Sequence, residues 1–290
     1  MMVALESAFP DVASKLDEEG HKRWKMEGGH LRDLLNLTSE ELAALDLATD
    51  QFEQSGLSME AKELRRLKDK ILALVPRMTK ARIETDHEAL LEARGFIARP
   101  GPRPKVDEQI LFEIAEAIKS CRVLQIVYHS HRDQEPKPRK VAVYGLLYGL
   151  RHYIVGKAIG DNKDTLRTYR LDAIDSAEVC NETYEIPDGF DLQSFANRAF
   201  GVYQKDDEYK KVIWKFSPKA AENAKSYQFH PDQKIEERLD GSVIISFRAS
   251  GLLEMCWHLY SWGDQVQVVE PVELIEMVKN YRRSDFPAMP

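Results

Sequence analysis

The segment GFIARPGPRPK, residues 95–105, constrains the fold of this chain more than any other stretch. It holds three prolines and two glycines in eleven residues. Such a segment cannot continue a helix or lie inside a sheet, because proline lacks a backbone donor and fixes φ. Apolar residues recur at helical spacing before it, and a period of two dominates the sequence that follows residue 122. The chain is therefore predicted to be an α+β protein that changes character at this linker.

The part before the linker is predicted to be mainly helical. Thr38 and Glu41 form a capping box, in which each side chain satisfies a backbone donor at the helix start. The expected helices run from Thr38 to about Gln54, from a Ser58 cap to Val75, and over residues 79–94. Ahead of them, residues 9–26 alternate around the turn Asp17–Gly20, which predicts a β-hairpin.

The part after the linker opens with a short helix from Asp107 and then adopts a period of two. One helix followed by five short strands with tight turns indicates a small closed barrel. The strands are expected in the segments RVLQIVYHS, RKVAVYGLLY, RHYIVGKAI, TLRTYRLDAI and SAEVCNETYEI.

The last eighty residues read as strand, helix, strand, strand, helix, strand and a final helix. The Asp240-Gly241 turn separates two of the strands, and a helix is expected to start at Ser217-Pro218. This order indicates a split βαβ module with its helices on one face of an antiparallel sheet.

Charge is distributed unevenly along the chain. The formal net charge is −7. Between Lys119 and Arg170, however, Lys and Arg outnumber Asp and Glu by eleven to four, so this basic island lies in an otherwise acidic protein. A basic island is a candidate anion-binding site. The alternative is a solvated charged face, which is the commoner meaning of such clusters.

Several cations of this island lie inside strand-like segments with tyrosines between them. Alternation places Arg151 and Tyr153 on one strand face and His152 on the other. Arginines with neighbouring tyrosines suit phosphate capture and base stacking. The opposing interpretation makes the tyrosines barrel core and the arginines surface decoration. The candidate ligand-binding residues are Tyr128, His129, Ser130, Arg139, Arg151, Tyr153, Arg167, Tyr169 and Arg170.

Signatures of catalysis or metal binding are not found. The chain has no GxGxxG, GxxxxGK[ST], GxSxG or HExxH motif. His129 and His131 could begin a metal site, but no third ligand follows at a recognisable spacing. Asp172 is expected to form an ion pair or a turn rather than to act as a base. We therefore expect no enzyme, no cofactor and no metal.

Three cysteines without a pairing pattern indicate reduced thiols in the cytoplasm. No apolar run is long enough to span a membrane.

The strands around residue 152 resemble the WYL domain of bacterial transcriptional regulators. His152-Tyr153-Ile154 occupy the positions of the family's Trp-Tyr-Leu. The segment from Arg167 to Ile174 resembles the family's run of arginine, aromatic, arginine, leucine, aspartate, arginine and isoleucine, with Ala173 at the later arginine. LQIVYHS and PRKVAVYGL resemble the two preceding strands, and LYSWGDQVQVVEPVELIEMV resembles the WCX-type extension behind WYL domains.

The resemblance implies a fold for each part of the chain. The barrel would be an Sm-like, SH3-type five-stranded barrel, and the last module would be ferredoxin-like. The implied domains are a remnant of a winged helix-turn-helix (1–29), a helical linker or dimerisation segment (30–105), the WYL barrel (106–188), and a connecting helix with the WCX-type module (189–290).

The resemblance also implies a DNA-binding wing in FPDVASKLDEEGHKRWKMEGG, with Lys15, His21, Lys22 and Arg23 as DNA contacts. Residues 1–8 would then be the tail of the recognition helix. The base-reading residues of such a helix lie at its N-terminal end, which would precede Met1. Either the reading frame begins further upstream, or the DNA-binding unit has been lost.

The function implied is that of a cytoplasmic, homodimeric transcriptional regulator. Its WYL barrel would sense a nucleotide or a short single-stranded nucleic acid, and its full-length form would bind promoter DNA. The alternative is an accessory protein that senses the same ligand and binds a partner protein instead of DNA. A third hypothesis, a nucleotide hydrolase with His129 or His131 as base, lacks a partner nucleophile.

Overall fold

The computed structural model describes most of the chain after residue 36 and two strands before it. The residues whose backbone and side chains it describes are 37–75, 83–95, 101–102, 104–130, 135–160 and 165–280. For residues 12–16, 22–26 and 77–82 it describes the backbone alone.

The chain divides into two compact units. The first comprises Met1–Val141, Tyr148–Tyr153 and Arg170–Asn181, and the second comprises Ala142–Leu147, Ile154–Tyr169 and Glu182–Pro290. Among the helices described, none combines the length and the hydropathy needed to cross a lipid bilayer.

The predicted hairpin and helices of the N-terminal part are present. Strands β1 (Val12–Leu16) and β2 (Lys22–Met26) pair antiparallel, with Lys15 opposite Arg23. Helices α3 (Ser39–Gln54), α4 (Ser58–Leu74) and α5 (Arg77–Glu92) follow.

The capping box of α3 is confirmed by its two hydrogen bonds. The Glu41 amide donates to Thr38 Oγ1 at 3.1 Å, and the Thr38 amide donates to Glu41 Oε2 at 2.9 Å. The predicted Ser58 cap is wrong. Leu57 occupies the N-cap position without a side-chain hydrogen bond, because α3 leads directly into the tight turn Ser55–Leu57 and Ser58 is already helical.

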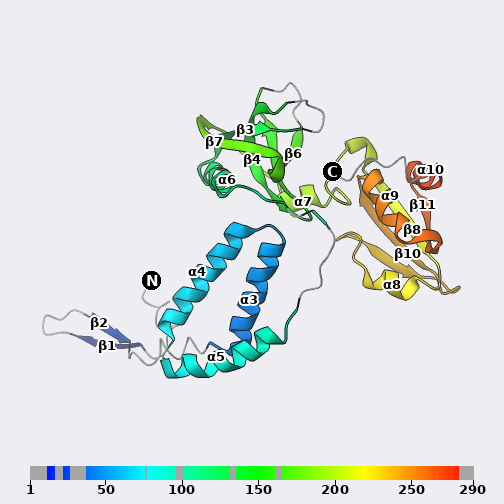
Figure 1. Ribbon diagram of the computed structural model, residues 1–290. Coiled ribbons are helices and arrows are strands. Elements are labelled where there is room, and N and C mark those ends of the chain that lie inside the picture. The colour runs from blue at the N-terminus through cyan, green and yellow to red at the C-terminus, as the bar shows by residue number, and fades with distance from the viewer. Residues whose placement is uncertain are drawn as a thin grey trace. The chain divides into compact units, whose positions relative to one another are not determined.

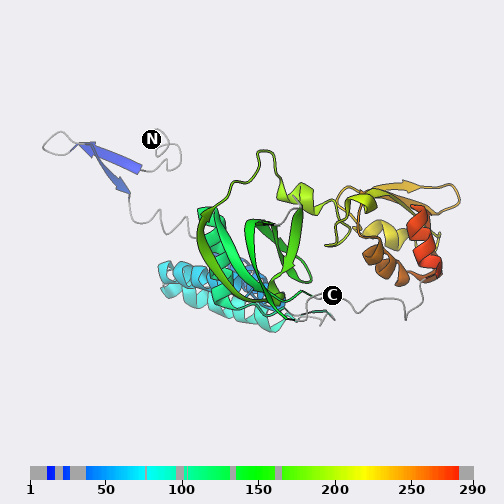
Figure 2. The same cartoon turned by 90° about the horizontal axis from the view of Figure 1, so that it is seen from above.

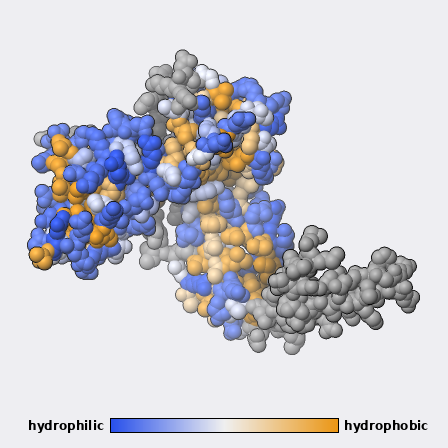
Figure 3. Space-filling model, turned by 180° about the vertical axis from the view of Figure 1, so that it is seen from behind, coloured by the Kyte–Doolittle hydropathy of each residue, from blue (hydrophilic) through white to orange (hydrophobic). Residues whose placement is uncertain are grey.

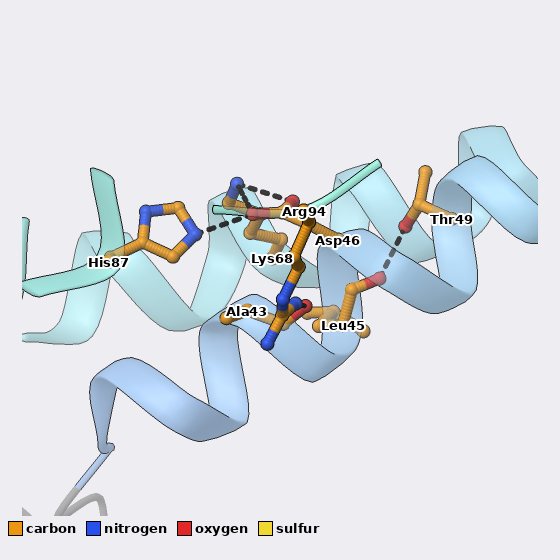
Figure 4. A network of polar contacts seen from close by, with 7 residues as sticks. All are labelled: Ala43, Leu45, Asp46, Thr49, Lys68, His87 and Arg94. Atoms are coloured by element: carbon orange, nitrogen blue, oxygen red, sulfur yellow. Dashed lines mark hydrogen bonds and ion pairs between the residues drawn. The ribbon is translucent and has the colours of Figure 1, made fainter. Parts of the chain in front are cut away.

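A polar network ties the three helices together (Figure 4). Asp46 of α3 accepts hydrogen bonds from Lys68 of α4 at 2.6 and 2.8 Å, and it lies 2.6 Å from Nε2 of His87 in α5. Figure 1 shows α3 and α4 side by side, with α5 running across their ends. Among the side chains that the structure describes, Leu42, Val75 and Ile83 are the buried members of the apolar core of this segment. The polar contacts add to the stability that this core provides.

The next part contains one helix and the five predicted strands. Helix α6 (Glu108–Ser120) is capped by Asp107, whose carboxylate accepts from the Gln109 amide at 2.7 Å. The sheet has the strand order β6-β5-β4-β3-β7. Its strands are β3 (Arg122–Tyr128), β4 (Lys137–Tyr148), β5 (His152–Ala158), β6 (Leu166–Arg170) and β7 (Ile174–Thr183). A short 3-10 turn, η1 (Leu171–Ala173), stands where the sequence predicted a continuing strand.

A short helix, α7 (Leu192–Ala196), precedes the C-terminal module. The strands of the module are β8 (Lys210–Phe216), β9 (Lys234–Glu237), β10 (Val243–Ala249) and β11 (Val266–Glu270). They form an antiparallel sheet of order β11-β8-β10-β9. The helices are α8 (Ala221–Ser226), α9 (Leu252–Tyr260) and α10 (Val272–Asn280), which lie together on one side of the sheet (Figure 2).

This arrangement is the predicted ferredoxin-like module, and it confirms the mixed α+β class. The start expected for α8 at Pro218 is wrong. The Ser217 amide donates a hydrogen bond to the Gln265 carbonyl at 2.9 Å, which keeps Ser217 in the strand region. Residues 218–220 form a turn, and the helix begins at Ala221.

Aromatic rings fill the core of the C-terminal module. Trp214 and Phe216 are fully buried and lie edge-on to Phe247 and Trp262, at ring distances of 5.1 and 4.9 Å. The imidazole of His258 lies among these rings, and its Nε2 accepts a hydrogen bond from Trp262 Nε1 at 3.2 Å. Burial lowers the pKa of His258, because the charged form would lose its hydration.

We therefore expect this module to lose stability in mild acid. The folded-state pKa lies below the unfolded value of about 6.5, so the unfolded chain takes up the proton first as the pH falls. The stability contributed by neutral His258 is present above about pH 6.5 and is lost progressively below it. Urea unfolding followed by tryptophan fluorescence between about pH 7.5 and pH 5 measures this, because Trp214, Trp257 and Trp262 lie in the module. His258→Gln should weaken the pH dependence, and an unchanged dependence would contradict the assignment.

Candidate anion-binding site

Two arginines share one carboxylate at the end of the five-stranded sheet. Arg151 stands just before β5, Arg170 ends β6, and Asp172 lies in the turn η1. Arg170 Nε donates to Asp172 Oδ1 at 2.9 Å, and Arg151 forms an ion pair with the other carboxylate oxygen. The three side chains are only 14–19% exposed. The two guanidiniums and the single carboxylate together carry a net positive charge, and all three groups are half-buried.

A tyrosine and a third arginine lie next to this cluster of two arginines and one aspartate. The Arg170 amide donates to the Tyr128 hydroxyl at 3.3 Å. The Arg139 guanidinium lies over the Tyr128 ring, 5.5 Å from its centroid. Tyr128 ends β3 and Arg139 lies in β4, so the termini of neighbouring strands bring these groups together.

The side chains of this cluster are of the kind that proteins use to hold anions. A guanidinium offers planar N–H groups that match two oxygens of a phosphate, and a neighbouring carboxylate holds its orientation. The prediction that Asp172 forms an ion pair is confirmed.

The remaining predicted residues lie in several places. His129 is exposed, and its amide donates to the Ala173 carbonyl at 2.9 Å. Ser130, Tyr153 and Arg167 are half-buried. Tyr169 is 2% exposed and packs in the core, so its ring offers no open face to a base.

The expected DNA contacts are described only in part. Lys15, Lys22 and Arg23 lie in β1 and β2, where the backbone alone is described. His21 and His131 lie outside the described residues. Among the residues that the structure describes, no three His, Cys, Asp or Glu side chains gather in a way that could hold a metal ion.

His152 connects the sheet to the helical segment. Its side chain is buried, and its Nε2 lies 2.7 Å from the Ser55 carbonyl in the turn between α3 and α4. A carbonyl only accepts, so Nε2 carries the proton and neutral His152 is in the Nε2–H form. No local pattern in the sequence indicates this contact, because its two ends are 97 residues apart.

The turn that receives His152 is shaped by a glycine. Gly56 has φ +78°, and a Cβ there would lie 2.5 Å from the Pro104 carbonyl oxygen. Two further contacts join the same elements. Lys62 pairs with Glu108 at 2.9 Å, and the Tyr148 hydroxyl donates to Glu60 at 3.4 Å. Burial and the Glu60 carboxylate raise the pKa of Tyr148. These hydrogen bonds and this ion pair therefore hold the helical segment to the sheet domain.

Comparison with known families identifies the five-stranded sheet domain and the C-terminal module. The WYL domain matches residues 109–179, and the WCX domain matches residues 211–283. No curated protein matches the chain.

Two solved structures are similar at low identity. One is the proteasome accessory factor B/C (PafBC) of Arthrobacter aurescens, with 18% identity and a TM-score of 0.33 over 95% of this chain. The other is a CRISPR Cas-related protein, with 15% identity and a TM-score of 0.43 over 73% of this chain. This chain spans 38% and 58% of the lengths of those two chains.

The two matches coincide with the five-stranded sheet domain and with the ferredoxin-like module that follows it, and together they define the class as a WYL-type protein. The chain belongs to the proteins that carry a WYL domain followed by a WCX domain, which confirms the family resemblance seen in its sequence.

We expect His152→Phe to loosen the contact between the helical segment and the sheet. Phenylalanine keeps an aromatic ring in the buried space but leaves the Ser55 carbonyl without its donor, which costs about 1–2 kcal/mol. Amide hydrogen exchange measured by mass spectrometry should accelerate in peptides covering residues 52–62. His129→Phe, which replaces an exposed histidine directly after β3, serves as the matched control. Equal protection in both variants would show that the His152 bond contributes nothing.

Proposed function

We propose that this protein is a transcriptional regulator whose WYL domain senses a nucleotide or a short single-stranded nucleic acid. The observation that carries the proposal is the pair of half-buried guanidiniums on Asp172, next to Tyr128 and Arg139. Phosphate oxygens of the effector would meet the N–H edges of Arg151 and Arg170. A base would stack near Tyr128, with Arg139 contributing its planar face.

We further propose that effector binding is transmitted through β5. Arg151 and His152 are consecutive, and their side chains reach Asp172 and the Ser55 carbonyl. An effector that draws Arg151 toward itself would change how His152 meets the α3–α4 turn. The helical segment would pass this change to a DNA-binding part. Such coupling requires that the effector bind the two states with different affinity.

The effector site is tested by fluorescence-anisotropy titration with a labelled single-stranded oligonucleotide. Arg151→Ala and Arg170→Ala should each weaken binding about tenfold or more, since each removes a charge-assisted bond worth about 1.5–3 kcal/mol. Arg122→Ala is the matched control. Arg122 lies in β3, and its guanidinium donates a hydrogen bond to Asn181 at 2.6 Å rather than to Asp172. Equal affinity in all four proteins would refute the site.

Promoter binding is tested by gel shift of the protein, in its longest reading frame, on its own upstream region. An effector-dependent shift supports the regulator. If the protein binds the oligonucleotide but does not shift the promoter fragment, the result supports the alternative, in which the protein acts through a partner protein and not through DNA.

We also propose that the protein is a homodimer formed through α4. Leu64, Leu67, Ile71 and Leu74 recur at spacings of three and four residues, which is typical of a helix seam. Leu67 and Leu74 are 48% and 59% exposed, while Ala61 of the same helix is buried. Hydrophobic side chains gather on the surface of the helical segment in Figure 3.

Leu67→Lys combined with Leu74→Lys should therefore raise the dissociation constant of the dimer at least about tenfold. Each leucine removed from an interface costs about 1.5–3 kcal/mol. Sedimentation equilibrium measures the change, and Ala73→Lys, an exposed position beside the seam, should leave it within about twofold. A wild-type protein that sediments as a monomer, or a double variant that still dimerises, would exclude this seam.

A further inference from the structure

The sheet of the WCX domain has one covered and one open face. Helices α8, α9 and α10 contribute to the same buried cluster as Val212, Trp214 and Phe216 of β8. The alternate residues of β8 and β10 point to the other face and are half-buried or exposed. They are Lys211, Ile213, Lys215, Ile244, Ser246 and Arg248.

One end of this open face carries two arginines on a single tyrosine ring. Tyr209 stands directly before β8 and is half-buried. The guanidinium carbons of Arg198 and Arg248 lie 4.9 and 5.2 Å from the centroid of its ring. Lys211 lies directly opposite Arg248 in the β8–β10 register, so three cations gather around the tyrosine.

The loop that supplies Arg198 is fixed in place. The Ser250 amide donates to the Arg198 carbonyl at 2.8 Å, next to the end of β10. Further along the loop, the buried Glu254 carboxylate accepts from the Val202 and Tyr203 amides at 3.0 and 3.2 Å. Burial raises the pKa of Glu254. The arginine pair is therefore part of an ordered arrangement.

The charges at this end are incompletely balanced within the domain. No carboxylate of the described residues forms an ion pair with Arg248. Arg198 pairs with Asp206 at 2.7 Å, but both side chains are largely exposed, so water and salt weaken that pair. Lys211 reaches Glu270 only at 3.8 Å. Like charges directly opposite on neighbouring strands destabilise a sheet, and a bound anion would remove this cost for Arg248 and Lys211.

Stacking on Tyr209 prepares the arginines for a particular kind of ligand. A guanidinium that lies on a ring uses its flat face and keeps its N–H edge for a ligand. That edge matches two oxygens of a phosphate group. The aliphatic side chains of Ile213 and Ile244 continue across the open face, and single-stranded nucleic acids lay their bases across open four-stranded sheets of this kind.

We infer that the open face of the WCX sheet binds single-stranded nucleic acid, with its phosphates held by Arg198, Arg248 and Lys211 beside Tyr209. This site is separate from the WYL effector site and does not depend on it. Phosphodiester recognition predicts an affinity that falls as salt rises, since each neutralised phosphate releases counterions.

The test is an anisotropy titration of the whole chain with a short labelled oligodeoxynucleotide of mixed sequence. Arg248→Gln and Arg198→Gln are each expected to weaken binding about tenfold and to flatten the salt dependence. Lys215→Gln is the matched control, because Lys215 lies on the same face but pairs with Asp240 at 3.2 Å. It should change the affinity less than about twofold. Arg248 and Lys215 lie on the open face of the sheet and Arg198 lies in an exposed loop, and circular dichroism verifies that the variants fold.

The same titrations are repeated in a chain that carries Arg151→Ala. A loss on Arg248→Gln in both backgrounds supports the WCX site, even if Arg151→Ala itself has no effect and the WYL effector site fails. Affinity unchanged by both arginine substitutions, or no binding by the parent chain, overturns the inference. Equal competition by a polyglutamate peptide would also overturn it, since the face would then recognise negative charge and not nucleic acid.

Discussion

The alternation of side chains at the start of β5 is the constraint on which the WYL part of the structure depends. Successive residues of a strand point to opposite faces. Arg151 therefore reaches the Asp172 carboxylate, while His152 turns inward to the Ser55 carbonyl. One peptide unit thus joins a charged, half-buried site to the contact that holds the helical segment. A shift of one residue in this strand would bury the guanidinium and expose the imidazole, and both contacts would be lost together.

The Asp172 carboxylate stabilises the charged site. Two guanidiniums brought close in a half-buried place repel each other, and each loses hydration. A shared carboxylate offsets both costs, and it fixes the planes of Arg151 and Arg170 before any ligand arrives. Preorganised donors bind better than mobile ones, because less side-chain entropy is lost on binding. The turn η1 supplies the aspartate at the point where β6 ends, so the chain topology produces the arrangement.

The WCX domain applies the same principle on a larger scale. Alternation along β8 and β10 sends Trp214, Phe216 and Phe247 into an aromatic core and sends Lys211 and Arg248 to the opposite face. All three helices gather on the core side, because only that face is apolar enough to bury them. The outer face consequently keeps its polar character and its space. Both WYL and WCX parts therefore place cations next to a tyrosine, at strand ends where side chains are only partly covered.

The sequence by itself determined the order and type of nearly every element. The Thr38 capping box, the five alternating strands and the final βαββαβ pattern are local signals, and each is confirmed within a few residues. Local signals also selected Arg151, Arg170, Tyr128 and Arg139 as candidates. Only the tertiary structure decided which candidates meet. It joined Arg151 and Arg170 through Asp172 and placed Tyr128, with Arg139 over its ring, beside Arg170. It also buried Tyr169 and set His152 against a turn 97 residues away. The reason is physical: hydrogen bonds and ion pairs between distant segments depend on how the chain packs, and periodicity carries no information about that.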